Sequence, residues 1–207
     1  MRTRRYAEIF FLMLCITPLL GVHEGRCDLS RYVSKYENPT IPLKSLAALS
    51  RYDHLIAYFT EFSYFLPRHK VSPEFIRALI FAESQGNPQA VSEKNAIGLG
   101  QILLSTGRQA AAELARSRTV FHYVQREKLA NLSAEDLHDP AVNILLTCYL
   151  VAKYNYRFNG KLDLVISAWN AGEHTDSLAF GKYADYEETK NLIGKVNGYY
   201  MFFLKKR

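Results

Sequence analysis

The chain has 207 residues, of which 48% are hydrophobic and 22% are charged. This composition is typical of a globular protein that is long enough for one substantial core and too short for two, so we expect one folded domain. The net charge of +6 does not indicate a nucleic-acid-binding protein, because the basic residues are scattered along the chain and are not massed on one segment. The six histidines show no i, i+4 pair and no nearby cysteine or carboxylate cluster, which argues against a metal site.

The first 25 residues resemble a targeting segment. "MRTRR" is positively charged, and residues 9–22 are apolar except for Thr17, but too short for a comfortable membrane span. We expect residues 1–25 to be a signal peptide or an uncleaved N-terminal membrane anchor, and the domain to be exported in either case. In an oxidising compartment Cys27 and Cys148 can pair, and the alternative is that Cys148 is a small buried hydrophobic residue.

The pattern after this segment predicts an all-α domain. Residues 26–42 are polar and interrupted by Pro39 and Pro42, so we expect a loose lead-in before a domain at 43–207. Apolar residues recur at helical spacing beyond it, and strand-like alternation is nearly absent. The expected helices are 43–49, 51–65, 73–84, 105–116, 119–128, 140–158, 162–170 and 186–204. Residues 89–100 are expected to form a loop, with helix resuming near Leu99.

The helix predicted at 73–84 has clear start and stop signals. Ser72 can cap it and Pro73 suits its first turn, while Gly86 and Pro88 end it. The positions of Leu79 and Ile80 predict a buried stripe along one face of this helix.

Glu83 extends that stripe, since it lies four residues after Leu79 and three after Ile80. We therefore expect its carboxyl group to point toward the core, in a last helical turn where the dipole disfavours negative charge. Both effects raise a carboxyl pKa, as a general acid near neutral pH requires. The alternative is a structural glutamate that is solvated or paired with Arg77.

Several separated motifs resemble one family. They are "ALIFAESQGNPQAVSEKNAIGLGQILLSTGRQAA" at 78–111, "DPAVNI" at 139–144, "AWNAG" at 168–172 and "YEETK" at 186–190. Together they resemble the soluble lytic transglycosylases, lysozyme-like enzymes that cut bacterial peptidoglycan, over residues 54–196. The resemblance implies a lysozyme-like all-α fold with no cofactor. A mildly basic surface also suits an anionic cell-wall polymer.

By this resemblance Glu83 is the catalytic acid and base, and Ser84 holds its carboxyl group by a hydrogen bond. Glu83 would protonate the oxygen that links N-acetylmuramic acid to N-acetylglucosamine. It would then take the proton of the muramyl C6 hydroxyl, which attacks C1 and closes a 1,6-anhydro ring. No water is consumed, so one carboxylate suffices where most glycosidases use two.

The resemblance also implies a substrate-binding set, made of Gly98, Leu99, Gly100, Gln101, Asn170 and Tyr186. Glycines without a Cβ let a glycan approach the backbone, and side-chain amides can donate to and accept from sugar hydroxyl and acetamido groups. Without the resemblance, "GLGQ" is only a flexible entry to a helix, and Asn170 only a neighbour of a helix end at Gly172.

Three positions depart from the family pattern. Trp169 replaces a tyrosine, and we expect its indole to wall the pocket and keep Glu83 dry. Gly100 replaces a methionine, which predicts one looser subsite. Leu192 replaces a second tyrosine, so a polar contact is expected to be missing there.

We therefore expect a peptidoglycan lytic transglycosylase in the periplasm or cell envelope, with glycan strands as its partner. Two alternatives stay open. One is a hydrolytic muramidase with a second carboxylate, for which Glu93 is the nearest in sequence. The other is a noncatalytic wall-binding part of a secretion, pilus or conjugation system. Any membrane contact is expected only through an uncleaved N-terminal segment.

Overall fold

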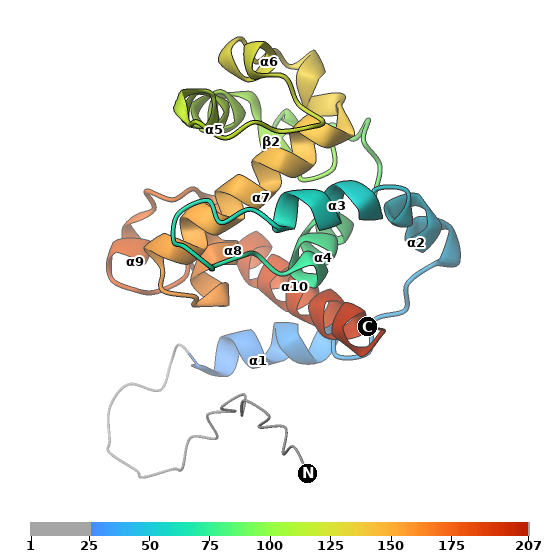
Figure 1. Ribbon diagram of the computed structural model, residues 1–207. Helices are drawn as coiled ribbons and strands as arrows, with labels where there is room; N and C mark the ends of the chain where they lie inside the picture. Colours follow the sequence, from blue (N-terminus) through green and yellow to red (C-terminus); the bar gives the residue numbers. More distant parts are fainter. Residues whose placement is uncertain (1–25, 207) are drawn as a thin grey trace, which may run out of the picture.

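The computed structural model describes residues 26–206, with side chains from residue 29 onward, and the predicted targeting segment lies outside this range. The described chain is all-α apart from one short hairpin, as predicted (Figure 1). Its helices are α1 (Arg26–Lys35), α2 (Leu43–Ser50), α3 (Asp53–Thr60), α4 (Pro73–Ser84), α5 (Leu104–Arg116), α6 (Arg126–Ala130), α7 (Pro140–Arg157), α8 (Leu162–Ala171), α9 (Asp176–Ala179) and α10 (Glu187–Lys205), with a 3₁₀ turn η1 at Glu135–His138. None of the described helices is long and apolar enough to cross a membrane.

Helix α10 organises the core, because it packs along α4, α8 and α1. Edge-to-face aromatic contacts join it to α4. The rings of Phe81 and Tyr199 lie 4.8 Å apart between centroids, and those of Phe75 and Tyr200 lie 5.6 Å apart. Such pairs are among the stabilising aromatic arrangements in protein cores. The last turn of α4 is thereby fixed against α10.

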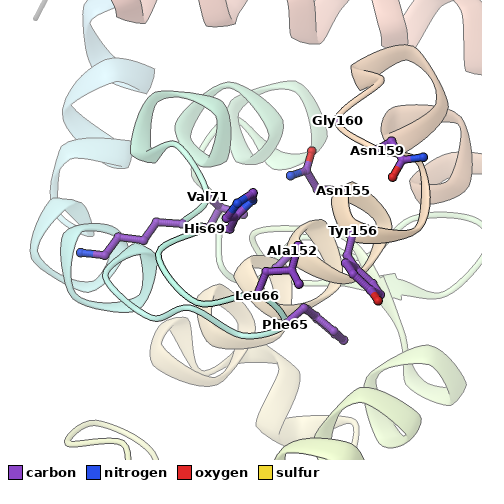
Figure 2. A pocket seen from close by; sticks show the side chains of 10 residues that line it. Phe65, Leu66, His69, Val71, Ala152, Asn155, Tyr156, Asn159 and Gly160 are labelled. Carbon is purple, nitrogen blue, oxygen red and sulfur yellow. The ribbon is translucent and has the colours of Figure 1, made fainter.

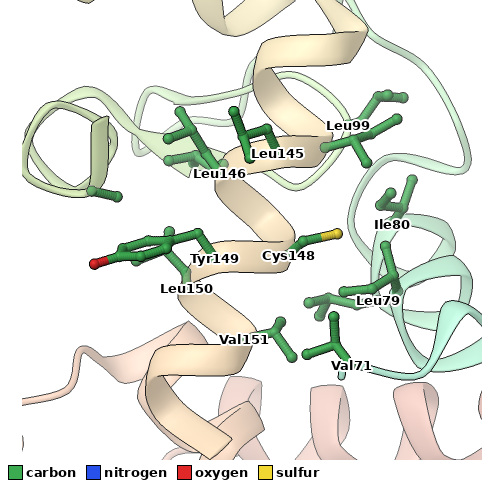
Figure 3. Packing of buried hydrophobic residues seen from close by; sticks show 14 of the residues in the cluster. Val71, Leu79, Ile80, Leu99, Leu145, Leu146, Cys148, Tyr149, Leu150 and Val151 are labelled. Carbon is green, nitrogen blue, oxygen red and sulfur yellow. The ribbon is translucent and has the colours of Figure 1, made fainter. Parts of the chain in front are cut away.

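Helix α7 runs through the middle of the apolar cluster (Figure 3). Cys148 lies on it, fully buried, on the side of Leu79 and Ile80 of α4, and burial raises the pKa of its thiol. Cys148 is therefore a small buried hydrophobic residue, which is one of the two alternatives that the sequence left open. The side chain of Cys27 lies outside the described residues, so the alternative pairing stays a prediction.

Residues 26–42 were predicted to be a loose lead-in, and this was wrong for its first part. Helix α1 lies directly on α10, where Gly194 and Gly198 let the two backbones meet. A Cβ at Gly194 would stand 2.3 Å from the carbonyl oxygen of Tyr32, and one at Gly198 would stand 2.1 Å from that of Tyr36. The Tyr32 hydroxyl donates to Glu187, which adds a polar tie between the helices.

The hairpin and the segment after α5 also differ from the prediction. Strands β1 (Ala96–Ile97) and β2 (Ile102–Leu103) pair antiparallel, with Ala96 opposite Leu103 and Ile97 opposite Ile102. Two residues are too few to show strand alternation in a sequence. In place of the helix expected at 119–128 there is only α6, which begins at Arg126. Phe121, before it, is not helical, and its ring packs on that of Phe62, two residues after α3, with centroids 5.1 Å apart.

Gly198→Val tests the docking of α1. The branched side chain would collide with the backbone of Tyr36, directly after α1, so we expect α1 to detach and the domain to lose about 1–3 kcal/mol of unfolding free energy. Amide hydrogen exchange over residues 29–36 should accelerate. Met201→Val, at a position of the same helix that is 44% exposed, is the matched control. Unchanged protection of α1 in Gly198→Val would contradict this packing.

Candidate active site

Helix α4 places Glu83 as the sequence predicted. The hydroxyl of Ser72 accepts a hydrogen bond from the Phe75 amide at 3.2 Å, which caps the helix start. At the other end Gln85 and Gly86 adopt left-handed backbone conformations, with φ of 54° and 81°, and stop the helix. Glu83 is thus in the last turn, partly buried, on the face of the fully buried Ile80.

The Glu83 carboxyl group meets the indole of Trp169. Trp169 Nε1 donates to Glu83 Oε1 at 2.9 Å, from the last turn of α8. Arg77, the alternative partner for Glu83, instead pairs with Asp53 at 2.8 Å. The tryptophan expected to wall the carboxyl group therefore contacts it directly and supplies one hydrogen-bond donor.

The environment raises the pKa of Glu83 to about 7. Burial is the largest cause, since it removes water from the charged form. The hydrogen bond from Trp169 and the positive charge of Lys195 act in the opposite direction, and the negative charge of Glu188 adds to the rise. At neutral pH both the acid and the carboxylate are populated, which suits a group that must donate and then accept a proton.

Lys195 fixes the helix end that carries Glu83. Its Nζ donates to the carbonyl oxygen of Ala82 at 2.7 Å, so a cation on α10 binds the C-terminal turn of α4. Cations at this end of a helix interact favourably with its dipole. The sequence analysis assigned no role to Lys195, and its only signal was a basic residue within an otherwise apolar stretch of the last helix.

Ser84 does not hold the Glu83 carboxyl group, contrary to the prediction. Its hydroxyl donates to the carbonyl oxygen of Leu99 at 2.7 Å and accepts from the amide of Gly86 at 3.3 Å. Ser84 therefore ties the hairpin turn to the end of α4. Its effect on Glu83 is through the position of that turn.

The "GLGQ" motif forms the turn between β1 and β2, and its side chains face inward. Leu99 is fully buried, and Gln101 Nε2 donates to the carbonyl oxygens of Ala90 and Gly98 at 3.1 and 2.9 Å. The glycan contacts predicted for Leu99 and for the Gln101 amide nitrogen therefore do not fit this geometry. These groups instead shape the turn.

The two glycines of this turn face α7 and not a ligand groove. A Cβ at Gly98 would stand 2.3 Å from the carbonyl oxygen of Leu137, and one at Gly100 would stand 2.3 Å from Thr147 Oγ1. Both glycines are buried. The prediction that they open the backbone to a glycan was wrong, as was the looser subsite expected from Gly100, because close packing on α7 requires them.

Asn143 is the residue that holds the turn, and sequence reasoning assigned it no role. Its Nδ2 donates to the carbonyl oxygens of Ile97 and Leu137 at 3.0 and 2.8 Å, and its Oδ1 accepts from the Gly100 amide at 2.8 Å. The side chain is fully buried and fully hydrogen-bonded, as buried polar groups require. The available signal was an amide in the apolar run that follows "DPAV".

Asn170 joins α8 to the start of α10. Its Oδ1 accepts from Thr189 Oγ1 at 2.6 Å, and its side chain also bonds to Glu188, which pairs with Lys94 of the 89–100 loop at 2.5 Å. The amide predicted to grip an acetamido group is thus oriented by protein contacts next to Trp169. The polar chain from Lys94 to Asn170 borders the Glu83 site.

The remaining predicted residues make no hydrogen bond or ion pair with Glu83 among residues 29–206. Tyr186 is 58% exposed and lines a separate notch with His174 and Asp185. Leu192, in place of a tyrosine, is buried in the core. Glu93 is exposed on its loop. Among the described residues no group of three or more His, Cys, Asp or Glu is placed to hold a metal ion.

Comparison with known proteins identifies the class of this fold and site. The sequence model of the family described as "Transglycosylase SLT domain" matches residues 64–192, more than half of the chain. The chain belongs to this family. Its all-α lysozyme-like fold is the one that the sequence predicted.

Particular relatives carry transglycosylase names. The chain is 38% identical over 77 residues to "Membrane-bound lytic murein transglycosylase E" of Buchnera aphidicola, a match that covers 37% of this chain and 30% of that protein. It is 28% identical over 159 residues to a "Putative soluble lytic murein transglycosylase" of Haemophilus influenzae, covering 71% of this chain and 25% of that protein.

Solved structures share the fold. The 70 kDa soluble lytic transglycosylase SLT70 from Escherichia coli superposes with a TM-score of 0.57 at 18% identity, over 87% of this chain and 29% of that one. An inactive mutant of lytic transglycosylase Slt from Pseudomonas aeruginosa superposes with a TM-score of 0.53 at 22% identity, over 80% of this chain and 24% of that one. The chain thus spans between 24% and 30% of the length of these four proteins.

The raised pKa of Glu83 predicts a pH-dependent stability. Its ordinary value is 4.5, so the cost of ionising it in the fold is absent below pH 4.5, grows up to about pH 7 and is complete above it. Glu83→Gln removes that cost. The stability of the variant relative to wild type should therefore rise by up to about 3 kcal/mol between pH 4 and pH 8. Urea unfolding at both pH values measures it.

The control for this experiment is Glu93→Gln, which neutralises an exposed carboxylate on the nearby loop. It should show no comparable rise. A Glu83→Gln difference that stays constant or falls as pH rises would contradict the desolvated environment of Glu83.

Gly100 and Thr147 should be energetically coupled. Gly100→Ala places a Cβ against Thr147 Oγ1 and should cost about 1–3 kcal/mol of unfolding free energy. Thr147→Gly should cost about 1 kcal/mol or more through helix propensity and lost packing. The double variant should be more stable than the sum of the single effects, as chemical denaturation can measure. Additive effects would contradict the contact. Gly107→Ala is the control, because the atoms nearest to its Cβ would be side-chain methyl groups of Leu132, Leu137 and Ile102, at 3.2–3.4 Å.

Proposed function

We propose that this chain is a peptidoglycan lytic transglycosylase in which Glu83 is the only acid and base. The observation that carries the proposal is one desolvated carboxyl group, with a pKa of about 7, hydrogen-bonded to Trp169 in a chain of the SLT domain family. The names of the murein transglycosylases that it resembles support the same activity and substrate. So does the inactive Pseudomonas aeruginosa mutant, in which a glutamine replaces one glutamate.

The hydrogen bond from Trp169 determines where the proton of Glu83 lies. An indole N–H only donates, so Oε1 of Glu83 must accept, and the acidic proton of the neutral form is on Oε2. Oε2 is therefore the atom that gives its proton to the glycosidic oxygen. After that step Trp169 stabilises the carboxylate that is left, by the same hydrogen bond.

In the second half of the reaction the Glu83 carboxylate removes the proton of the muramyl C6 hydroxyl. The bond between C1 and the glycosidic oxygen breaks and the leaving sugar keeps the first proton as part of its new hydroxyl group. The C6 oxygen bonds to C1 and closes the 1,6-anhydro ring, and its proton replaces the one that Glu83 lost. No water enters and the enzyme returns to its starting state. A pKa near 7 serves both halves, because neither the acid nor the carboxylate is strongly disfavoured at neutral pH.

The other carboxylates near this site have different partners. Glu188 is held by Lys94 and Asn170, and Glu93 is exposed on its loop. Neither contacts Glu83 through a hydrogen bond among the described residues. This arrangement supports a one-carboxylate reaction over the hydrolytic muramidase, which needs a second group to activate water.

We also propose that the protein acts in the periplasm or cell envelope. The positive and apolar residues 1–25 support export, and one relative in Buchnera aphidicola is named as membrane-bound. Work at a secretion, pilus or conjugation assembly is a further part of this proposal.

Mass spectrometry of muropeptides tests the activity. The full-length chain in detergent is incubated with purified peptidoglycan, beside Glu83→Gln. We expect products that carry 1,6-anhydromuramyl ends, one water lighter than reducing muropeptides, and their yield to fall by at least about 100-fold in the variant.

Glu93→Gln is the matched control and should retain its activity. Reducing ends would identify a muramidase instead. Cleavage that survives Glu83→Gln at the wild-type rate would overturn the role of Glu83. Binding to peptidoglycan without products would identify a wall-binding protein.

A further inference from the structure

A second pocket lies far from Glu83, at the opposite ends of the two helices that build the active site. It is lined on one side by Val71, two residues before α4 begins, and on the other by Gly160, two residues before α8 begins. Glu83 and Trp169 are in the last turns of the same helices. With 12 residues in α4, the two sites are separated by about 18 Å of helix.

The pocket has the size of a small-ligand site, with a volume of about 370 Å³. The C-terminal part of α7 and the residues after it form one wall, and the segment between α3 and α4 forms the other (Figure 2). Phe65, Leu66 and His69 come from that segment. Asn155, Tyr156 and Asn159 come from α7 and its end.

Two side-chain amides in this pocket have no protein partner. No side-chain hydrogen bond of Asn155 or Asn159 occurs within residues 29–206, although each amide has two donor hydrogens and an acceptor oxygen. The amides of Asn143 and Gln101, by contrast, are hydrogen-bonded within the protein. Asn159 has a left-handed backbone, with a φ of 50°, as asparagine at a helix end can adopt.

An aromatic surface lies beside these amides. The rings of Phe65 and Tyr156 are nearly parallel, with an interplanar angle of 11° and centroids 5.9 Å apart. Tyr156 is 54% exposed, so the part of its ring that Phe65 does not cover presents apolar area to solvent. The pocket therefore combines flat apolar area with free hydrogen-bonding groups that are uncharged.

Charge restricts the ligand further. No carboxylate lines the pocket, and its one lysine, Lys70, is ion-paired with Glu61. A neutral ligand with one apolar face and several hydroxyl or amide groups fits this lining. These are the properties of a pyranose ring with an acetamido group, whose C–H face can pack on an aromatic ring.

We propose that this pocket, at the α3–α4 segment and the end of α7, is a second saccharide site that takes an N-acetylhexosamine unit. It is a binding site and needs no chemistry from Glu83. A chain that holds a glycan at both ends of α4 contacts its polymer at two points, so release from one does not release the protein.

An NMR titration with tetra-N-acetylchitotetraose tests the proposal. The full-length Glu83→Gln chain, in a detergent without a sugar head group, prevents cleavage of the probe. The side-chain NH₂ signals of Asn155 and Asn159 report on the second pocket. The indole N–H of Trp169, the single tryptophan, reports on the Glu83 site.

We expect the Asn155 and Asn159 signals to shift with the saccharide, and the shift to need about tenfold more saccharide after Tyr156→Ala. The matched control is Phe180→Ala, which removes an aromatic ring that is 80% exposed elsewhere. It should leave the titration unchanged. Asn159→Gly, which keeps the left-handed backbone, should weaken binding without unfolding the helix end.

The two probes separate the second site from the proposed function. Shifts of Trp169 alone would overturn the second site and leave the catalytic proposal intact. Shifts of Asn155 and Asn159 alone would support the second site and count against glycan binding at Glu83. If neither shifts with the saccharide, or if the two asparagines respond only to a free stem peptide, the saccharide site is wrong.

Discussion

The packing of α10 on α4 is the constraint on which the site depends. Aromatic edges from both helices interlock at Phe81 and Tyr199, and Lys195 of α10 donates to the last turn of α4. The packing of these helices places the positive charge of Lys195 near the Glu83 carboxyl group, which is itself largely buried. Burial and the cation have opposite effects on the Glu83 pKa, and the resulting value of about 7 reflects the larger effect of burial. A separation of the two helices would therefore change the pKa of Glu83.

A second layer of contacts holds the hairpin turn beside that carboxyl group. Asn143 binds the turn from α7, and Ser84 binds it from α4. Residues 98–101 thus determine the shape of the turn, and their side chains contact the rest of the protein. Conformations that are forced by packing in this way are well suited to active sites, since the group that reacts is held by rigid elements.

The sequence predicted well what local patterns determine. The bounds of α4 followed from Ser72, Pro73 and Gly86, and the inward direction of Glu83 followed from its spacing to Ile80. It failed where the deciding partner is distant in the chain. The bond from Ser84 goes to Leu99, the glycines face α7, and α1 forms because Gly194 and Gly198 leave room for it on a helix more than 150 residues away. No periodicity within a segment contains that information.

The contact between Gly100 and Thr147 also restricts how such a sequence can change over time. A side chain at position 100 costs least after position 147 has lost its hydroxyl group, because a Cβ at 100 and Oγ1 of Thr147 would stand 2.3 Å apart. In the reverse direction position 100 changes first, since a threonine at 147 costs least once position 100 is glycine. The route of lowest cost between the two arrangements therefore passes through an intermediate sequence with small residues at both positions. Such an intermediate has a more loosely packed turn between β1 and β2, next to the end of α4 that carries Glu83.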